Sequence, residues 1–188
     1  MTETTTPKRS VALWVQITIW AFLAGLLVLV GVILGKRQQG TVQPGDAIPD
    51  FSLPLFSGYE YEGQSSVKLS DLQGKIVVLN FWASWCKPCE QEAAELEEAW
   101  RFYEPSGEVI FLGADYVDTE PEARSYLKKF SITFPNGPDM GTKISQMFRI
   151  RGVPETYFID QNGVLYYVKV GPFASVDEIK NIVAQKLP

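Results

Sequence analysis

The chain has 188 residues, 46% of them hydrophobic and 13% aromatic, which is enough to build a core and excludes a disordered chain. Residues 1–40 contain four basic and one acidic residue, whereas residues 41–188 contain 13 basic and 21 acidic ones. This acidic balance disfavours nucleic acid as a partner. The absence of histidine and the presence of only two cysteines exclude Ser-His-Asp and Cys-His catalysis and the usual four-ligand zinc site. We therefore expect no metal.

The first predicted element is an apolar run at residues 11–34, which holds 24 residues without a charge. As a helix it would be roughly 36 Å long, and the hydrocarbon core of a bilayer is about 30 Å thick. A cleaved signal peptide is the alternative, but its apolar core is usually about 7–15 residues long and precedes a small-residue cleavage site. The sequence "LGKRQQG" offers no such site. We predict an N-terminal tail at 1–10, a retained transmembrane helix at 11–34 and a polar linker at 35–48.

The charges beside this span do not settle its orientation. Lys8 and Arg9 precede it, and Lys36 and Arg37 follow it. The positive-inside rule therefore finds equal charge on both sides, and orientation has to be inferred from the domain that follows.

Residues 49–188 alternate between strand and helix signals. Continuous apolar runs and an Asn-Gly turn between two apolar segments predict strands at 75–83, 109–116, 156–160 and 164–170. Apolar residues at three- to four-residue spacing, with Thr119 as one N-cap, predict helices at 90–103, 119–130 and 175–187. This order predicts an α/β fold in which helices cover both faces of a mixed sheet.

Both cysteines lie in "NFWASWCKPCEQE", where the first predicted strand meets the first helix. The free N–H groups and partial positive charge of a helix N-terminus favour the thiolate form of Cys86, and Lys87 adds a cation. Pro88 is tolerated in the first helical turn, and Cys89 can attack a mixed disulfide formed at Cys86. Two buried structural cysteines are the alternative, against which the spacing, the proline and the position at a helix start all argue.

The stretch "NFWASWCKPC" resembles the active site of the thioredoxin superfamily, and "FRIRGVPETYFID", residues 148–160, resembles its second active-site segment. The resemblance implies a thioredoxin-like fold and a redox-active Cys86–Cys89 disulfide. It also implies that the Val153–Pro154 bond is cis, that Pro154 packs against the cysteines and shapes a substrate groove, and that Trp85 covers this groove.

The segments "PGDAIPDFSLPLFSG" and "VKLSDLQGKIVVLNFWASWC" narrow the resemblance to membrane-anchored thiol–disulfide oxidoreductases of the TlpA, ResA and CcmG type. It covers residues 49–188. It implies an N-terminal hairpin and a central insertion, for which residues 131–148 are the candidate. It also implies a membrane protein with its N-terminus in the cytoplasm and its thioredoxin-like domain on the extracytoplasmic side.

Three polar residues are expected to support the site. Asn80 stands where thioredoxin has a buried aspartate, so that proton acceptor is absent. Glu92, one turn after Cys89, and Glu155, directly after Pro154, match carboxylates of the resembling subfamilies and could take a proton from Cys89. For Glu92 the alternative is a solvated helix face, because Glu90, Glu95, Glu97 and Glu98 crowd the same helix.

The resulting prediction is a disulfide-exchanging enzyme that needs no cofactor and reduces the disulfides of protein substrates. The resemblance implies apocytochrome c as the leading substrate and a membrane thiol carrier as the electron donor. A peroxiredoxin-type peroxidase is one alternative, because "GDAIPDF" resembles the opening of those chains, although no P-x-x-x-T/S-x-x-C motif precedes Cys86. A non-catalytic, tethered module that binds a client or senses redox state is the other.

Overall fold

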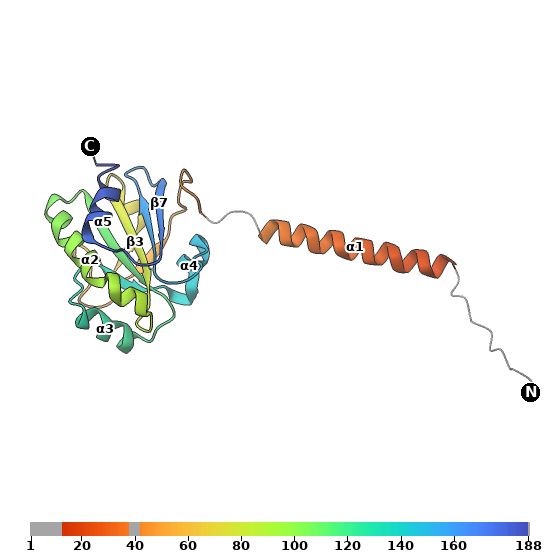
Figure 1. Ribbon diagram of the computed structural model, residues 1–188, viewed down its shortest axis with the longest axis horizontal. Coiled ribbons are helices and arrows are strands. Elements are labelled where there is room, and N and C mark those ends of the chain that lie inside the picture. The colour runs from red at the N-terminus through yellow and green to blue at the C-terminus, as the bar shows by residue number, and fades with distance from the viewer. Residues whose placement is uncertain (1–12, 38–41, 188) are drawn as a thin grey trace, which may run out of the picture. The chain divides into compact units, whose positions relative to one another are not determined.

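The computed structural model describes residues 13–37 and 42–187 and divides the chain into two units, Met1–Gly40 and Thr41–Pro188. The first unit contains helix α1, Leu13–Arg37, whose segment Leu13–Val32 is long and apolar enough to cross a membrane (Figure 1). The predicted tail 1–10, with Lys8 and Arg9, lies outside the described residues. So do residues 11–12 of the predicted span and residues 38–41 of the predicted linker.

The second unit is built on a five-stranded mixed sheet with the strand order β5-β4-β3-β6-β7. Its strands are β3 (Ile76–Trp82), β4 (Val109–Asp115), β5 (Asn136–Pro138), β6 (Glu155–Ile159) and β7 (Leu165–Val170). Strands β3, β4 and β5 are parallel to one another. Strand β6 pairs antiparallel with β3, and β7 pairs antiparallel with β6. Every residue of β3, β4 and β6 is buried, which explains why β3 and β4 are mostly apolar rather than alternating.

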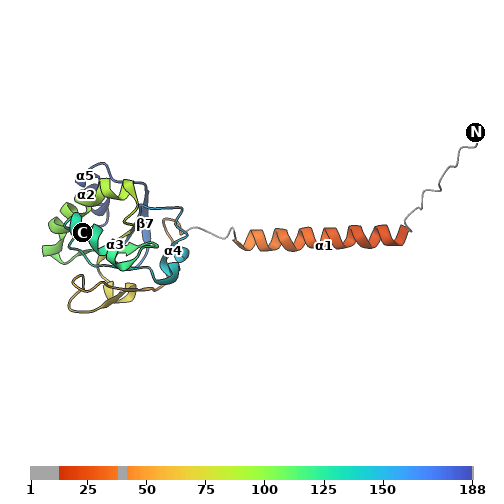
Figure 2. The same ribbon diagram turned by 90° about the horizontal axis from the view of Figure 1, so that it is seen from below.

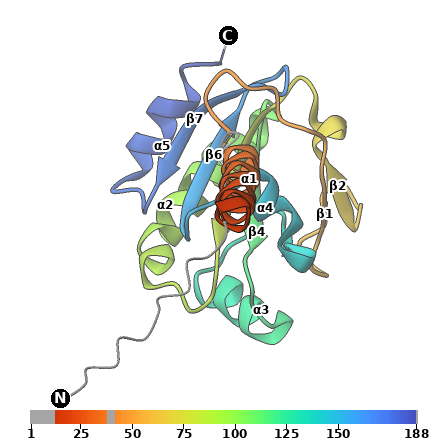
Figure 3. The same ribbon diagram turned by 90° about the vertical axis from the view of Figure 1, so that its right-hand side faces the viewer.

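Helices cover both faces of this sheet. Helices α2 (Lys87–Tyr103) and α5 (Val176–Val183) lie side by side on one face (Figures 2 and 3), and the Tyr103 hydroxyl donates to the Lys180 carbonyl across them at 3.3 Å. Helix α4 (Lys143–Phe148) lies on the other face, where the Phe148 ring packs 5.5 Å from the ring of Phe81 on β3. Helix α3 (Glu120–Lys129) connects β4 to β5.

The N-terminal hairpin implied by the resemblance is present. Strand β1 (Ser52–Pro54) pairs antiparallel with β2 (Ser66–Lys68), and β1 continues into Phe56, whose N–H donates to the Asn136 carbonyl of β5 at 2.9 Å. The predicted insertion, residues 131–148, contains β5 and α4. Together with the mixed sheet, these features make the unit a thioredoxin-like α/β fold.

The structure departs from the predicted elements in several places. Helix α1 continues through residues 35–37 of the predicted linker, and α5 ends at Val183 rather than at residue 187. Helix α2 begins at Lys87 rather than at residue 90, because Pro88 fits the first turn. Strand β5 and helix α4 are absent from the predicted order, since three residues rich in Gly and Pro, and a six-residue helix, carry too little periodicity to be recognised. Thr119 is the N-cap of α3, but its hydroxyl donates to Glu122 instead of accepting a backbone N–H.

Candidate active site

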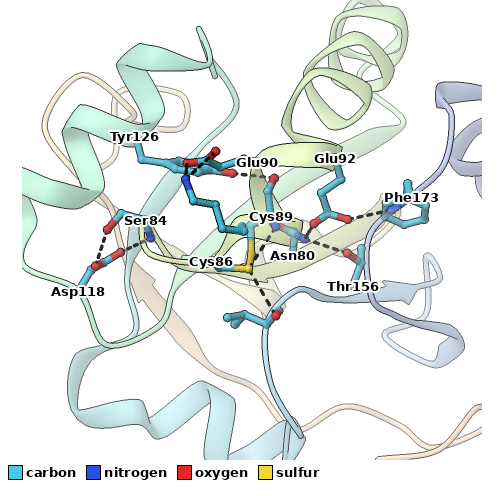
Figure 4. The surroundings of a disulfide bond; sticks show 12 residues. Asn80, Ser84, Cys86, Cys89, Glu90, Glu92, Asp118, Tyr126, Thr156 and Phe173 are labelled. Carbon is cyan, nitrogen blue, oxygen red and sulfur yellow. Dashed lines mark hydrogen bonds and ion pairs between the residues drawn. A yellow bond between two sulfur atoms is a disulfide. The ribbon is translucent and has the colours of Figure 1, made fainter.

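The two cysteines form a disulfide at the point where β3 leads into α2 (Figure 4). Cys86 is the N-cap residue of α2, and its sulfur accepts the N–H of Cys89 at 3.1 Å. Both residues are buried, with 4% of Cys86 and 1% of Cys89 exposed. Cys86, the slightly more exposed residue of the pair, is therefore also the one whose sulfur accepts an N–H at the helix N-terminus, which favours its thiolate form after reduction.

The neighbours of Cys86 in the sequence point away from the disulfide. The Lys87 side chain is 81% exposed, and its Nζ lies 3.2 Å from the Glu90 carboxylate, which also pairs with Lys129 at 3.2 Å. Trp85 is 58% exposed, and its indole N–H donates to the Val117 carbonyl at 3.3 Å. Lys87 is thus held by an ion pair, and Trp85 extends toward the loop after β4.

The Val153–Pro154 peptide bond is cis, in agreement with the resemblance. The Val153 carbonyl oxygen lies 3.4 Å from the Cys86 sulfur, so the segment before β6 lies against the disulfide. Pro88 and Pro154 line a groove of about 250 Å³ together with residues at the end of β7. Trp85 is not among the residues that line this groove, which differs from the predicted cover.

Glu92 is buried and joins three parts of the fold, which overturns its interpretation as a solvated residue of the helix. Its Oε1 accepts from Asn80 Nδ2 at 2.8 Å, and its Oε2 accepts from the Phe173 N–H at 3.1 Å. Asn80 Nδ2 also donates to the Thr156 hydroxyl at 2.9 Å (Figure 4). Asn80 therefore acts as a buried donor to a carboxylate, at the position where thioredoxin has a carboxylate of its own.

Burial raises the pKa of Glu92 to about 7. The hydrogen bonds from Asn80 and Phe173, and the charge of Lys169, oppose this shift, whereas Glu95 adds to it. Glu92 and Cys89 line the same internal cavity, whose volume is about 10 Å³. A carboxylate that titrates near neutral pH thus faces the same small space as the more buried cysteine.

Glu155 lies on the opposite face of the sheet from Glu92. Successive side chains of a strand alternate between faces, and Thr156 points toward Asn80, so Glu155 and Tyr157 point away from it. The Glu155 carboxylate accepts the Arg151 N–H and the Tyr157 hydroxyl, each at 2.7 Å. Its two oxygens thus bind groups on either side of Pro154 in the sequence rather than the cysteines.

The structure adds two contacts that the sequence did not indicate. The Tyr126 hydroxyl of α3 donates to the Cys89 carbonyl at 2.8 Å, and its ring stacks on Trp82 at 4.5 Å. Two residues before Cys86, the Ser84 N–H and hydroxyl donate to the Asp118 carboxylate, at 2.5 and 2.7 Å (Figure 4). Tyr126 fits an ordinary apolar position of a helix and Asp118 lies in a loop, so no local pattern distinguishes them.

Asp115, at the end of β4, is a second buried carboxyl group near the site. It is 3% exposed, and burial together with the adjacent Asp118 raises its pKa to about 8, with a further contribution from Asp139. Asp115 therefore carries a proton at neutral pH, unlike ordinary surface carboxyls.

A C-x-x-C pair at the start of a helix, beside a cis-proline on a thioredoxin-like sheet, defines a thiol–disulfide oxidoreductase that acts on disulfide-containing proteins. The model of the AhpC/TSA family matches residues 44–168. The chain is 35% identical over 153 residues to the thiol-disulfide oxidoreductase ResA of Oceanobacillus iheyensis, covering 78% of each chain. It therefore belongs to the AhpC/TSA family and, within it, to the ResA-type thiol–disulfide oxidoreductases.

One further relative and one solved structure support the same family assignment. The chain is 32% identical over 160 residues to the thioredoxin-like protein YneN of Bacillus subtilis, which covers 80% of this chain and 89% of that one. A crystal structure of a secreted Mycobacterium tuberculosis disulfide oxidoreductase homologous to DsbE matches with a TM-score of 0.61 and 26% identity, over 72% of this chain and 95% of the other.

Proposed function

We propose that this protein is held in the membrane by α1 and reduces disulfides of protein substrates on the extracytoplasmic side, with Cys86 as the attacking thiol and Cys89 as the resolving thiol. The observation that carries this proposal is the placement of Cys86 at the N-cap of α2, where its sulfur accepts the Cys89 N–H, while Cys89 lies deeper.

The proposed reaction has two exchange steps. The Cys86 thiolate attacks one sulfur of the substrate disulfide, which forms a mixed disulfide and releases the other substrate sulfur as a thiolate. The Cys89 thiolate then attacks the Cys86 sulfur, forms the Cys86–Cys89 disulfide and releases the second substrate thiolate. Two electrons pass to the substrate, and a thiol donor must return two electrons and two protons to the enzyme. A membrane thiol carrier would be that donor.

Glu92 is the proposed acceptor of the Cys89 proton. Burial places its pKa at about 7, which suits a general base at neutral pH, and it shares a cavity with Cys89. Asn80 and Phe173 hold its two oxygens. Glu155 is a weaker candidate for this role, because Arg151 and Tyr157 already occupy its oxygens; we propose that it holds the Pro154 segment in place.

Four features support the finer parts of the proposal. The Lys87-Pro88 pair between the cysteines resembles reducing members of the superfamily, which favours reduction over oxidation. The resemblance to the TlpA, ResA and CcmG type makes apocytochrome c the leading substrate. Leu13–Val32 can span a bilayer. A related disulfide oxidoreductase is described as secreted, which favours the extracytoplasmic side for this domain and the cytoplasm for the N-terminus.

A trapping experiment tests the proposal. Reduced full-length protein should reduce a disulfide-containing protein, and Cys89→Ser should accumulate a mixed disulfide that Cys86→Ser does not form. A non-catalytic binding module would keep its activity in both variants, and consumption of hydrogen peroxide would instead identify a peroxidase. The reduction potential gives the direction: a reductant should lie near the thioredoxin value of about −270 mV, and a value near −120 mV would make the protein an oxidant.

The same assay distinguishes the proposed roles of Glu92 and Glu155. Glu92→Gln should slow release of the substrate from its mixed disulfide and change the pH dependence of that step. Glu155→Gln should change it less, since the carboxamide can still accept the Arg151 N–H. Wild-type release rates from about pH 5 to 9 in Glu92→Gln would show that another group takes the proton.

A further inference from the structure

The exposed apolar side chains of the globular unit gather around the disulfide. Among residues 42–187, the large hydrophobic side chains that are exposed are those of Trp85, Phe102, Val117, Met140 and Val170. Trp85 adjoins Cys86, Val117 accepts a hydrogen bond from Trp85, and Val170 lines the groove beside Pro88. Met140 follows β5, the neighbour of β4 in the sheet. Exposed apolar surface that is concentrated in one place marks an interaction site more often than isolated residues do.

Three of these side chains belong to neighbouring loops at one edge of the sheet. Trp85 follows β3, Val117 follows β4 and Met140 follows β5, and these three strands are parallel neighbours. The carboxyl ends of parallel strands meet at the same edge of a sheet. We call Trp85, Val117 and Met140 the apolar lip. Its side chains are 58%, 60% and 62% exposed, respectively.

The loop that carries Val117 is fastened to the loop that carries Cys86. The Tyr116 N–H donates to the Trp82 carbonyl at 2.7 Å, and the Trp85 indole donates to the Val117 carbonyl at 3.3 Å. The Asp118 carboxylate accepts two hydrogen bonds from Ser84, two residues before Cys86. Trp85 and Val117 of the lip are therefore held beside the loop that carries Cys86.

Val117 adopts a backbone conformation that a valine rarely tolerates. Its φ is +55°, in the left-handed region that disfavours β-branched residues. Such strain persists only where the surroundings impose it, and it is concentrated at functional sites. Here the hydrogen bonds of the adjacent residues impose it, and the valine side chain remains exposed where glycine or asparagine would fit the backbone better.

Cys86 lies between the apolar lip and a second apolar surface. On one side, Trp85 of the lip directly precedes Cys86 in the sequence. On the other side, the Val153 carbonyl oxygen lies 3.4 Å from the Cys86 sulfur. Val153 lines the groove of about 250 Å³ with Pro88, Pro154, Val170 and Pro172. An extended polypeptide advances about 3.3 Å per residue, so residues within about three positions of a cysteine bound to Cys86 can reach surfaces up to about 10 Å away on either side of the sulfur.

We infer that the apolar lip is a specificity-determining surface that binds an apolar side chain close to the reacting cysteine of an extended polypeptide substrate. This inference rests on the proposed function and adds the substrate class: a polypeptide segment with apolar residues beside its cysteine, as opposed to a small thiol or a polar segment. Val117 and Met140 supply this selectivity, and the groove beside Pro154 holds the chain on the other side of the sulfur.

The test compares two peptides that each contain an internal disulfide and differ only beside the first cysteine, where one has leucine and the other serine. Reduced full-length protein in detergent is mixed with each peptide, and the rate of peptide reduction is measured. Wild-type protein should reduce the leucine peptide about tenfold faster, which corresponds to burial of roughly half a leucine side chain. Val117→Asn should lower this ratio to about twofold, and Met140→Ser should lower it as well.

The variants carry their own controls. Asparagine adopts the left-handed conformation more readily than valine, so Val117→Asn should unfold at the wild-type temperature or higher, and a lower ratio cannot then reflect misfolding. Val117→Ile, which retains an apolar side chain, should keep the preference. Phe102→Ser, which removes an exposed apolar side chain outside the lip, should also keep it.

The outcomes separate the inference from the proposed function. If wild-type protein reduces neither peptide nor a small disulfide such as bis(2-hydroxyethyl) disulfide, the proposed function itself is wrong. If it reduces both peptides at the same rate, or if Val117→Asn and Met140→Ser keep the wild-type ratio, the lip does not determine specificity while the oxidoreductase activity stands.

Discussion

The oxidised protein should lose stability between pH 5 and pH 6.5, and Glu92→Gln should reduce that loss by about half. The chain contains no histidine, and the disulfide keeps both thiols from titrating. Among the described residues, Glu92 and Asp115 are the carboxyl groups with pKa values raised to this range or above it, to about 7 and about 8, chiefly by burial. Both are protonated in the folded state and ionised in the unfolded chain within this window.

The direction in which stability changes with pH follows from the number of protons bound in each state. The folded state holds more protons than the unfolded state, so the free energy of unfolding falls as pH rises, by about 1.4 kcal/mol per pH unit for each group. Over 1.5 pH units the two groups together should remove about 4 kcal/mol, and Asp115 alone should remove about 2 kcal/mol in Glu92→Gln. Glutamine has one acceptor oxygen, so in Glu92→Gln either Asn80 or Phe173 loses its acceptor. This loss lowers the free energy of unfolding at every pH, so the slope with pH is the quantity to compare.

Urea unfolding followed by tryptophan fluorescence at four pH values between 5.0 and 6.5 measures this slope. Glu98→Gln is the matched control, because Glu98 lies on the same helix and is exposed; its slope should equal that of the wild type. Equal slopes in wild type, Glu92→Gln and Glu98→Gln would refute the reasoning, since they would show that Glu92 is already ionised at pH 5 in the folded protein.

Three further predictions concern the site and the anchor. In the reduced protein, iodoacetamide should label Cys86 before Cys89 near neutral pH, because Cys86 receives the helix N-terminal N–H groups; the reverse order would exchange the attacking and resolving roles. Tyr126→Phe should lower the free energy of unfolding by about 1 kcal/mol in urea titrations, because it loses the hydrogen bond to the Cys89 carbonyl and keeps the stack on Trp82; an unchanged value would mean that this bond contributes nothing. A membrane-impermeant thiol reagent should reach Cys86 in intact cells after reduction, and a mature N-terminus that lies after α1 would contradict the retained anchor.

The sequence alone identified the parts of the site that local signals specify. The W-C-x-P-C run predicted a change from strand to helix at the cysteines, because an apolar strand ends there and Pro88 is tolerated in the first helical turn. The predicted start at residue 90 was three residues late. The Asn-Gly pair fixed the hairpin between β6 and β7, where Gly163 adopts a φ of +78°. The uncharged run before residue 35 was sufficient for one helix that can span a membrane.

Only the tertiary structure decided which polar side chains lie near the two cysteines and which way they point. Glu92 resembles its neighbours on a helix crowded with glutamates, yet it is buried and accepts the N–H of Phe173, which lies 81 residues later in the sequence. Glu155 adjoins Pro154 in the sequence, yet strand alternation turns its carboxylate to the other face. Tyr126 and Asp118 reach the site from elements after β4. Desolvation and hydrogen bonding between segments far apart in the sequence depend on the folded arrangement, which no local pattern encodes.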